Sequence, residues 1–211
     1  MGVPRRTIAG VIACVLVIVV IQFWLPDSVT IGPVWLIPGL ELLGIPIALM
    51  VFANAGWRSR TLTRVVDAFL VLLVSASVMN AVLLLVSLLE GTRETGQYLL
   101  FAGFAVLIAN VLSFGLVYWW IDGGGPIVRA EGKVTDPDFL FPQQGNSGPD
   151  WTPSLIDYLF TAYTNIIAFS PTDTMPLRHR VKALFTIQSS TALLTIVVTL
   201  SRAINLIPGG S

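Results

Sequence analysis

Five long runs of apolar residues, separated by shorter polar segments, dominate the hydropathy pattern of this chain. A helix needs about 20 mostly apolar residues to cross the hydrocarbon core of a bilayer, where it satisfies its own backbone hydrogen bonds. Tryptophans also stand near the ends of these runs, as membrane–water interfaces favour. The pattern predicts five membrane-spanning helices, over residues 7–25, 34–53, 65–89, 98–121 and 181–207.

The segment between the fourth and fifth runs has a different character. Residues 122–153 are polar and rich in glycine and proline, and they predict a long loop. Within residues 154–169, polar side chains recur every three or four positions among apolar ones, which predicts a helix. This helix would be about 24 Å long, short for a crossing, and it carries an acid. We expect it to insert halfway into the membrane or to lie at its surface.

Composition agrees with the membrane assignment and excludes other classes of protein. Charged residues make up 11% of the chain, against roughly a quarter in soluble domains. The net charge of zero gives no basic surface for nucleic acid, and Cys14 is the only cysteine, which excludes an internal disulfide and a multi-cysteine metal site. We therefore predict an all-α membrane helix bundle, a single membrane domain over residues 1–211, with no cofactor and no metal.

The basic residues predict an orientation, because cytoplasmic loops of membrane proteins carry an excess of lysine and arginine. With five crossings and a cytoplasmic N-terminus, ten of the twelve basic residues lie on the cytoplasmic side, and only Arg93 and Arg202 lie toward the outside. A sixth crossing over residues 154–169 would move three basic residues outside. We therefore expect an inner-membrane protein whose N-terminus is cytoplasmic and whose C-terminus is outside.

The C-terminal half of the chain, roughly residues 98–207, resembles the pore module of two-helix potassium channels. Residues 157–164 look like its pore helix, Asp173 looks like the acid after its filter, and the fourth predicted span would be its outer helix. The glycines that a carbonyl-lined filter needs are missing, since residues 168–172 read Ala-Phe-Ser-Pro-Thr. The predicted orientation also places this loop in the cytoplasm. The resemblance implies a pore-like module without a selectivity filter, and we do not expect potassium selectivity.

Over most of its length the chain is also similar to a family of bacterial multipass membrane proteins of unknown function. The similarity lies in the basic loop of residues 58–64, in the aromatic end of the fourth span at residues 118–120, and in the last span, which ends near Asn205. The pore-like helix and the turn and basic cluster that follow it also match. This resemblance implies a bacterial inner-membrane protein and no particular activity.

Two charged residues inside the predicted spans are candidates for function. Glu41 lies in the second span and Arg202 in the last. An ionisable group in a membrane costs several kcal/mol unless it is paired or hydrated. A structural ion pair between Glu41 and Arg202, a transport or proton-relay role, and no role at all remain open.

The pore-like helix and the turn after it form a second candidate site. Its residues are Asp157, Thr164, Ser170, Thr172 and Asp173. Hydroxyl and carboxylate oxygens at a loop tip are suited to binding a cation, and the same residue types also make turns and helix caps. Both readings remain open.

Several uncharged polar residues lie within the predicted spans as well, among them Asn80, Asn110 and Gln188. Hydrogen bonds between helices account for such residues at about 1 kcal/mol each, and a water path is the alternative. We find no nucleophile, metal or phosphate-loop motif, so we do not expect an enzyme.

The leading hypothesis from the sequence is a multipass membrane protein with a degenerate pore-like module, in a transport-related or assembly role. One alternative is a homo-oligomeric ion channel that is not selective for potassium. Another is a membrane scaffold that binds a partner protein through residues 122–153. The lipid bilayer is the one partner that all three share.

The predicted topology can be tested with single cysteines near positions 95, 145, 175 and 209 in a Cys14→Ser background. Impermeant thiol reagents should label positions 95 and 209 from outside and positions 145 and 175 from the cytoplasm. Cytoplasmic labelling of position 209, or outside labelling of position 175, would contradict five crossings.

Overall fold

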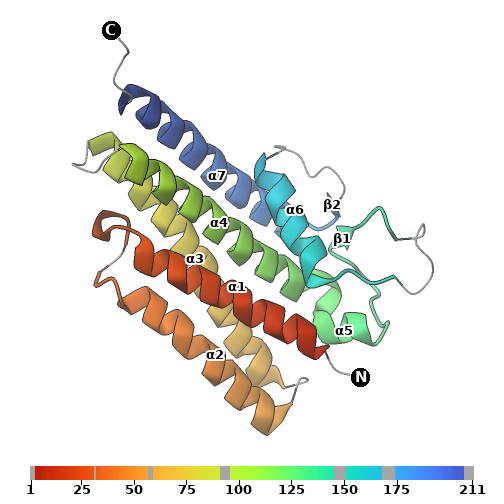
Figure 1. Ribbon diagram of the computed structural model, residues 1–211. Helices are drawn as coiled ribbons and strands as arrows, with labels where there is room; N and C mark the ends of the chain where they lie inside the picture. The colour runs from red at the N-terminus through yellow and green to blue at the C-terminus, as the bar shows by residue number, and fades with distance from the viewer. Residues whose placement is uncertain are drawn as a thin grey trace.

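The computed structural model shows a bundle of five long helices that run side by side in alternating directions (Figure 1). It describes residues 3–30, 32–56, 59–90, 96–144, 151–167 and 174–206, without the side chains of residues 27, 55, 90, 96, 99 and 202–206. The two termini lie at opposite ends of the bundle, as an odd number of crossings requires. We call the end that contains the start of the chain the N-terminal end.

Each long helix coincides with one predicted span. They are α1 (Arg5–Trp24), α2 (Leu36–Ala55), α3 (Arg60–Glu90), α4 (Gly96–Ile121) and α7 (His179–Leu206). All five are long and apolar enough to cross a membrane, which confirms the prediction of an all-α membrane helix bundle. The largest difference is the start of α3, five residues before the predicted span. The hydroxyl of Ser59 accepts hydrogen bonds from the backbone N–H groups of Thr61 and Leu62 and so caps the helix.

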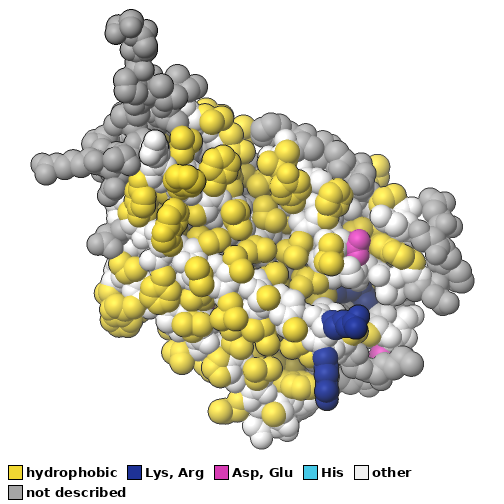
Figure 2. All heavy atoms as spheres, in the orientation of Figure 1, with side chains coloured by type: hydrophobic (Ala, Val, Ile, Leu, Met, Phe, Trp, Pro, Cys, Tyr) yellow, Lys and Arg dark blue, Asp and Glu magenta, His cyan; other side chains and the backbone are white. Residues whose placement is uncertain are grey.

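The surface of the molecule is as apolar as a membrane protein requires. Figure 2 shows hydrophobic side chains over most of the visible face, with basic side chains gathered toward the N-terminal end. Burial inside the bundle differs between helices. In the most apolar stretch of each helix, 61% of the α4 residues are buried, against 11% of the α2 residues. Helix α4 packs against α1, α3, α6 and α7, whereas α2 packs only against α1 and α3 among the long helices. Helix α4 is therefore the centre of the bundle.

The segment predicted as a long loop contains short regular elements that hydropathy does not indicate. These are the 3₁₀ helix η2 (Asp122–Gly124), the helix α5 (Pro126–Ala130) and the strand β1 (Phe139–Leu140). Another 3₁₀ helix, η1 (Asp27–Val29), lies between α1 and α2. Strand β1 pairs antiparallel with β2 (Met175–Pro176), with Phe139 opposite Pro176 and Leu140 opposite Met175. This pairing ties the loop to the start of α7.

The predicted pore-like helix is present as α6 (Leu155–Ile167). It begins near the N-terminal end and lies against α4 and the first half of α7 (Figure 1). Its buried residues are Leu155, Tyr158, Thr161, Ala162, Asn165 and Ile166. Its exposed residues include Ile156, Phe160, Tyr163 and Ile167. The helix thus turns an apolar face outward and places most of its polar contacts inside the protein.

Spacing predicts a polar stripe on this helix, over Ser154, Asp157, Thr161 and Thr164, but not which face is buried. Of the stripe's Ser154, Asp157, Thr161 and Thr164, only Thr161 is buried. The bundle-facing side is decided instead by a close approach to α4, where Leu159 lies directly over Gly115. A Cβ atom on Gly115 would stand 3.2 Å from the Cα atom of Leu159.

Replacing Gly115 should therefore separate α6 from α4. We expect Gly115→Leu to lower the free energy of unfolding by about 1–3 kcal/mol, the usual cost of overpacking, in thermal or denaturant unfolding of the purified protein in detergent. Gly39→Leu is the matched control, since a Cβ atom there meets nothing within 4 Å. Equal stability of the two variants would contradict the close packing of α6.

Candidate functional site

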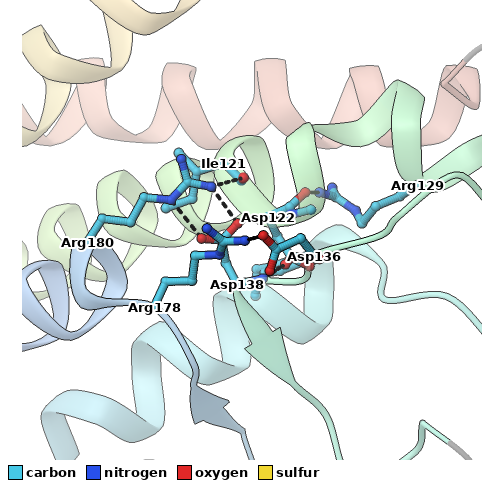
Figure 3. A network of polar contacts seen from close by, with 9 residues as sticks. Ile121, Asp122, Arg129, Asp136, Asp138, Arg178 and Arg180 are labelled. Atoms are coloured by element: carbon cyan, nitrogen blue, oxygen red, sulfur yellow. Dashed lines mark hydrogen bonds and ion pairs between the residues drawn. The ribbon is translucent and has the colours of Figure 1, made fainter.

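A cluster of charged residues closes the N-terminal end of the bundle, where α4 ends and α6 and α7 begin (Figure 3). Its members are Asp122 in η2, Arg129 in α5, Asp138 before β1, Tyr158 in α6 and Arg180 in α7. All except Arg180 are buried. Four separate elements and the loop before β1 therefore meet in one polar network.

Asp138 is the fully buried acid of this cluster, with none of its side chain exposed. Its two carboxylate oxygens accept hydrogen bonds from Arg180 Nε at 2.7 Å and Arg180 Nη2 at 2.6 Å. The backbone N–H of Gly123 also donates to Asp138 Oδ2, at 3.0 Å. Two parallel bonds from one guanidinium give a strong and directional ion pair, so this contact fixes the start of α7 against the end of α4.

Asp122 connects the same loop to α6. Its Oδ2 accepts a hydrogen bond of 2.5 Å from the Tyr158 hydroxyl, and its Oδ1 accepts one of 2.9 Å from the backbone N–H of Asp138. The phenol of Tyr158 remains protonated, because burial raises its pKa well above the ordinary value. Tyr158 is therefore a permanent donor that holds α6 to α4.

Arg129 completes the cluster by capping α4. Its guanidinium donates to the backbone carbonyl oxygens of Asp122, at 2.5 Å, and Trp119, at 2.6 Å. These carbonyls belong to the last turn of the helix and its 3₁₀ extension, where the intrahelical donors run out. The guanidinium carbon also lies 5.1 Å from the centre of the Tyr158 ring. Burial lowers the pKa of Arg129, and the neighbouring Tyr158, Asp122 and Asp138 oppose that shift.

Deeper in the bundle, Gln188 of α7 joins α4 and α6. Its Oε1 accepts hydrogen bonds from the Tyr118 hydroxyl at 2.7 Å and from Asn165 Nδ2 at 2.8 Å. Its Nε2 donates to the backbone carbonyl of Ala162 at 3.1 Å. Every polar atom of the Gln188 side chain is thus satisfied, which is the interhelical hydrogen bonding expected for a polar residue in a span. We call Tyr118, Asn165 and Gln188 the glutamine latch.

Beyond the glutamine latch, polar residues continue along the buried sides of three helices. They are Ser77, Asn80 and Ser87 of α3, Asn110 and Ser113 of α4, and Thr195 and Thr199 of α7. Their spacings of three, four and seven positions place them on one face of each helix. We call these seven residues the polar interior.

Contacts between the helices show that the middle of the polar interior lies at one depth. Gln188 contacts Tyr118, and Gly103 lies beside Thr199. Because α4 and α7 run antiparallel, Asn110 must lie between these two contacts, at about the level of Thr195. Between α4 and α3, the Trp120 indole donates to Asp67 at 2.7 Å. Because α3 and α4 also run antiparallel, the residue of α3 that lies ten positions after Asp67, Ser77, is at the level of Asn110, ten positions before Trp120.

The central residues of the polar interior have no hydrogen-bond partner among the residues that the structure describes. This holds for both side-chain atoms of Asn80 and Asn110 and for the hydroxyls of Ser77 and Ser113, each of which is almost fully buried. A buried polar group without a partner costs about 1–3 kcal/mol. The expected interhelical bonding therefore holds for Gln188 but not for Asn80 and Asn110.

Arg202 is the predicted partner of Glu41, and its side chain lies outside the described residues. Glu41 is fully buried in α2, and its Oε1 accepts a hydrogen bond of 2.6 Å from Gln22 of α1. In Figure 1, α2 and α7 form opposite edges of the bundle. The structure thus gives Glu41 a neutral partner that sequence analysis missed, and its pairing with Arg202 stays a prediction.

The pore-like site is described only in its first half. Asp157 Oδ2 accepts hydrogen bonds of 2.7 Å from both the backbone N–H and the hydroxyl of Ser154, which makes it part of a helix cap. The hydroxyl of Thr164 donates to the backbone carbonyl of Phe160 at 3.0 Å. Ser170, Thr172 and Asp173 lie outside the described residues, so a cation site at the turn stays a prediction.

Sequence analysis counted Arg129 and Arg180 only toward topology and overlooked Asp122, Asp138 and Tyr158. One local signal is the pair of aromatic residues beside Asp138, Phe139 and Phe141, within a segment that otherwise predicts a loop. Both side chains are buried in the structure. Within the described residues, no group of three or more histidine, cysteine, aspartate or glutamate side chains is placed to hold a metal ion.

Comparison of the chain with protein-family models, with curated proteins and with solved structures finds no match. Any function must therefore be argued from the charged cluster, the glutamine latch and the polar interior themselves.

The two neighbouring arginines at the start of α7 provide a matched test of the charged cluster. Arg180→Gln leaves the buried Asp138 without its cation, and we expect a loss of about 3 kcal/mol, the lower end of the range for a broken buried pair, since the Arg180 side chain is 56% exposed. Arg178 pairs with the exposed Asp136, so Arg178→Gln should cost less than about 1 kcal/mol. Denaturant unfolding measures both; similar losses would show that Asp138 does not depend on Arg180.

Proposed function

We propose that this protein is a membrane transport protein that passes small uncharged polar solutes through the polar interior of α3, α4 and α7. The observation that carries the proposal is the pair of buried amides, Asn80 and Asn110, that lack partners within the described part of the chain. A ligand or water that hydrogen-bonds to them would remove the cost of leaving them unpaired.

The chemistry of the polar interior selects the class of solute. Its side chains are amides and hydroxyls, which both donate and accept hydrogen bonds. None of its seven members carries a charge, and an ion at this depth would require charge compensation or a hydration shell. Water and small neutral molecules with several donors and acceptors, such as urea or glycerol, fit these groups.

The solute site would be closed on the N-terminal side in this conformation. The glutamine latch crosses the interior between α4, α6 and α7, and the charged cluster lies beyond it. Passage on this side would require Gln188 to release Tyr118 and Asn165. A small shift of the short helix α6 would release Asn165, and a change of the Gln188 rotamer would release Tyr118, while the five long helices keep their places.

A purely structural role explains the polar interior less well. Helices of a scaffold can associate through small and apolar residues, and unpaired amides in the middle of the bundle would weaken it. Transport explains why the unpaired amides and hydroxyls of α3 and α4 are gathered at one depth.

The proposal is tested with purified protein in liposomes, using stopped-flow light scattering to measure permeability to water, urea and glycerol. Asn80→Leu and Asn110→Leu keep the side-chain size and remove the hydrogen-bonding groups. We expect either change to reduce the protein-dependent permeability to at least one of these solutes by about tenfold, corresponding to the loss of one good hydrogen bond in the path.

Asn54→Leu is the control, because Asn54 is exposed at the end of α2 and bonds only to the backbone carbonyl of Met50. It should leave permeability unchanged. If wild-type protein adds no permeability over empty liposomes for any of the three solutes, the proposal is wrong. A rise in thermal stability for both buried variants, with unchanged flux, would instead show unpaired groups with no ligand.

A further inference from the structure

A separate cavity lies between α1, α2, α3 and α4, on the other side of α4 from the glutamine latch. Its volume is about 150 Å³. Among the residues that line it are Val15 of α1, Ala48 and Leu49 of α2, Phe69 of α3 and Trp119 of α4. All of its lining side chains are hydrophobic or glycine. Water has no partners in such a space, and an apolar cavity of this size accepts an apolar guest.

The cavity is accessible from the membrane side of α2. Leu49, one of its lining residues, is 45% exposed on the outer surface of the bundle. Helix α2 is also the least buried of the five long helices. In a bilayer, hydrocarbon chains of lipid surround this surface, so the apolar guest at hand is an acyl chain.

Charge at the nearby end of the bundle favours one kind of lipid. The α1 residues that line the cavity include Ile8 and Ile12, and Arg5 lies one turn before Ile8 on the same face of the helix. Arg5 is exposed, and about 10 Å of helix separates it from Ile12. Arg60 and Arg64 are exposed at the same end, at the start of α3. Asp67 is an acid of α3 that follows the cavity-lining residue Val66, and its carboxylate accepts a hydrogen bond from the Trp120 indole.

We propose that the cavity binds an acyl chain of an anionic phospholipid from the leaflet at the N-terminal end, with the lipid headgroup beside Arg5. The apolar lining holds the chain, and the arginine side chain attracts the phosphate and the anionic headgroup. This site is independent of the transport proposal, because it lies nearer the N-terminal end of the bundle than the polar interior and takes another ligand.

Trp119 reports directly on occupation of the cavity. It lines the cavity and is only 7% exposed to the surface. Phospholipids with brominated chains quench tryptophan fluorescence at short range, so they should quench Trp119 only if a chain enters the cavity. The protein for this experiment keeps Trp119 and has Phe at the other five tryptophan positions. It is reconstituted in bilayers with brominated phosphatidylglycerol or brominated phosphatidylcholine at the same mole fraction.

We expect strong quenching of Trp119 in this protein and its loss in Ala48→Phe, which fills the cavity. A protein that keeps only Trp24, a surface residue, is the control and should be quenched with or without Ala48→Phe. If Trp119 is not quenched while Trp24 is, no acyl chain enters the cavity and the proposal fails. If the multiple replacements prevent folding, the difference in quenching between wild type and Trp119→Phe gives the same answer.

The headgroup is tested by comparing the two brominated lipids. Phosphatidylglycerol should quench Trp119 more strongly than phosphatidylcholine, and Arg5→Gln should abolish the difference, whereas Arg6→Gln, which lies on another face of α1, should preserve it. Equal quenching by both lipids in wild-type protein would overturn the assignment of an anionic lipid. Solute permeability, measured in parallel, should be unaffected by Ala48→Phe, which separates this site from the transport path.

Discussion

The carboxylate of Asp122 holds together the part of the molecule that is not a simple bundle. It receives the Tyr158 hydroxyl from α6 and the backbone N–H of Asp138 from the loop, and Asp138 in turn holds Arg180 at the start of α7. These bonds act together with the packing of Leu159 over Gly115 to keep α6 against α4, and a helix of only 13 residues depends on such contacts because short helices are marginal alone. The position of the glutamine latch depends on this arrangement, because Asn165 extends from the same helix.

The molecule combines two solutions for polar groups away from water. At the N-terminal end, charges are buried but fully paired, by the bidentate contact of Arg180 with Asp138 and by the two carbonyl bonds of Arg129. In the middle of the bundle, the uncharged side chains of Ser77, Asn80, Asn110 and Ser113 have no partner among the described residues. The first arrangement stabilises a fixed geometry. The second leaves hydrogen-bonding capacity for a ligand, which is why we place transport there.

Close helix contacts divide the interior into separate regions. Gly115 lets α6 approach α4 on one face, and Gly44 lies directly against Phe69 where α2 meets α3. The space between α1, α2, α3 and α4, which Gly44 and Phe69 also line, is not filled by side chains, and an apolar cavity remains. The apolar cavity lies nearer the N-terminal end of α3 and α4 than the polar interior does, so one small bundle offers sites at two depths to two chemically different ligands.

The five long helices could be predicted from the amino-acid sequence because hydrophobicity over about 20 consecutive residues is a local property, and the bilayer thickness sets its length. The short helix α6 could be predicted as well, from its spacing, although its buried face could not. That face depends on Gly115 and Tyr158 meeting partners elsewhere in the chain.

The contacts of the charged cluster join residues that are far apart in the sequence: Tyr158 lies 36 positions from Asp122, and Arg180 lies 42 positions from Asp138. No periodicity reports contacts between residues so far apart. The number and approximate length of the long helices follow from the sequence alone, whereas the pairing of buried charges and the gathering of unpaired amides at one depth follow from how antiparallel helices are aligned in three dimensions.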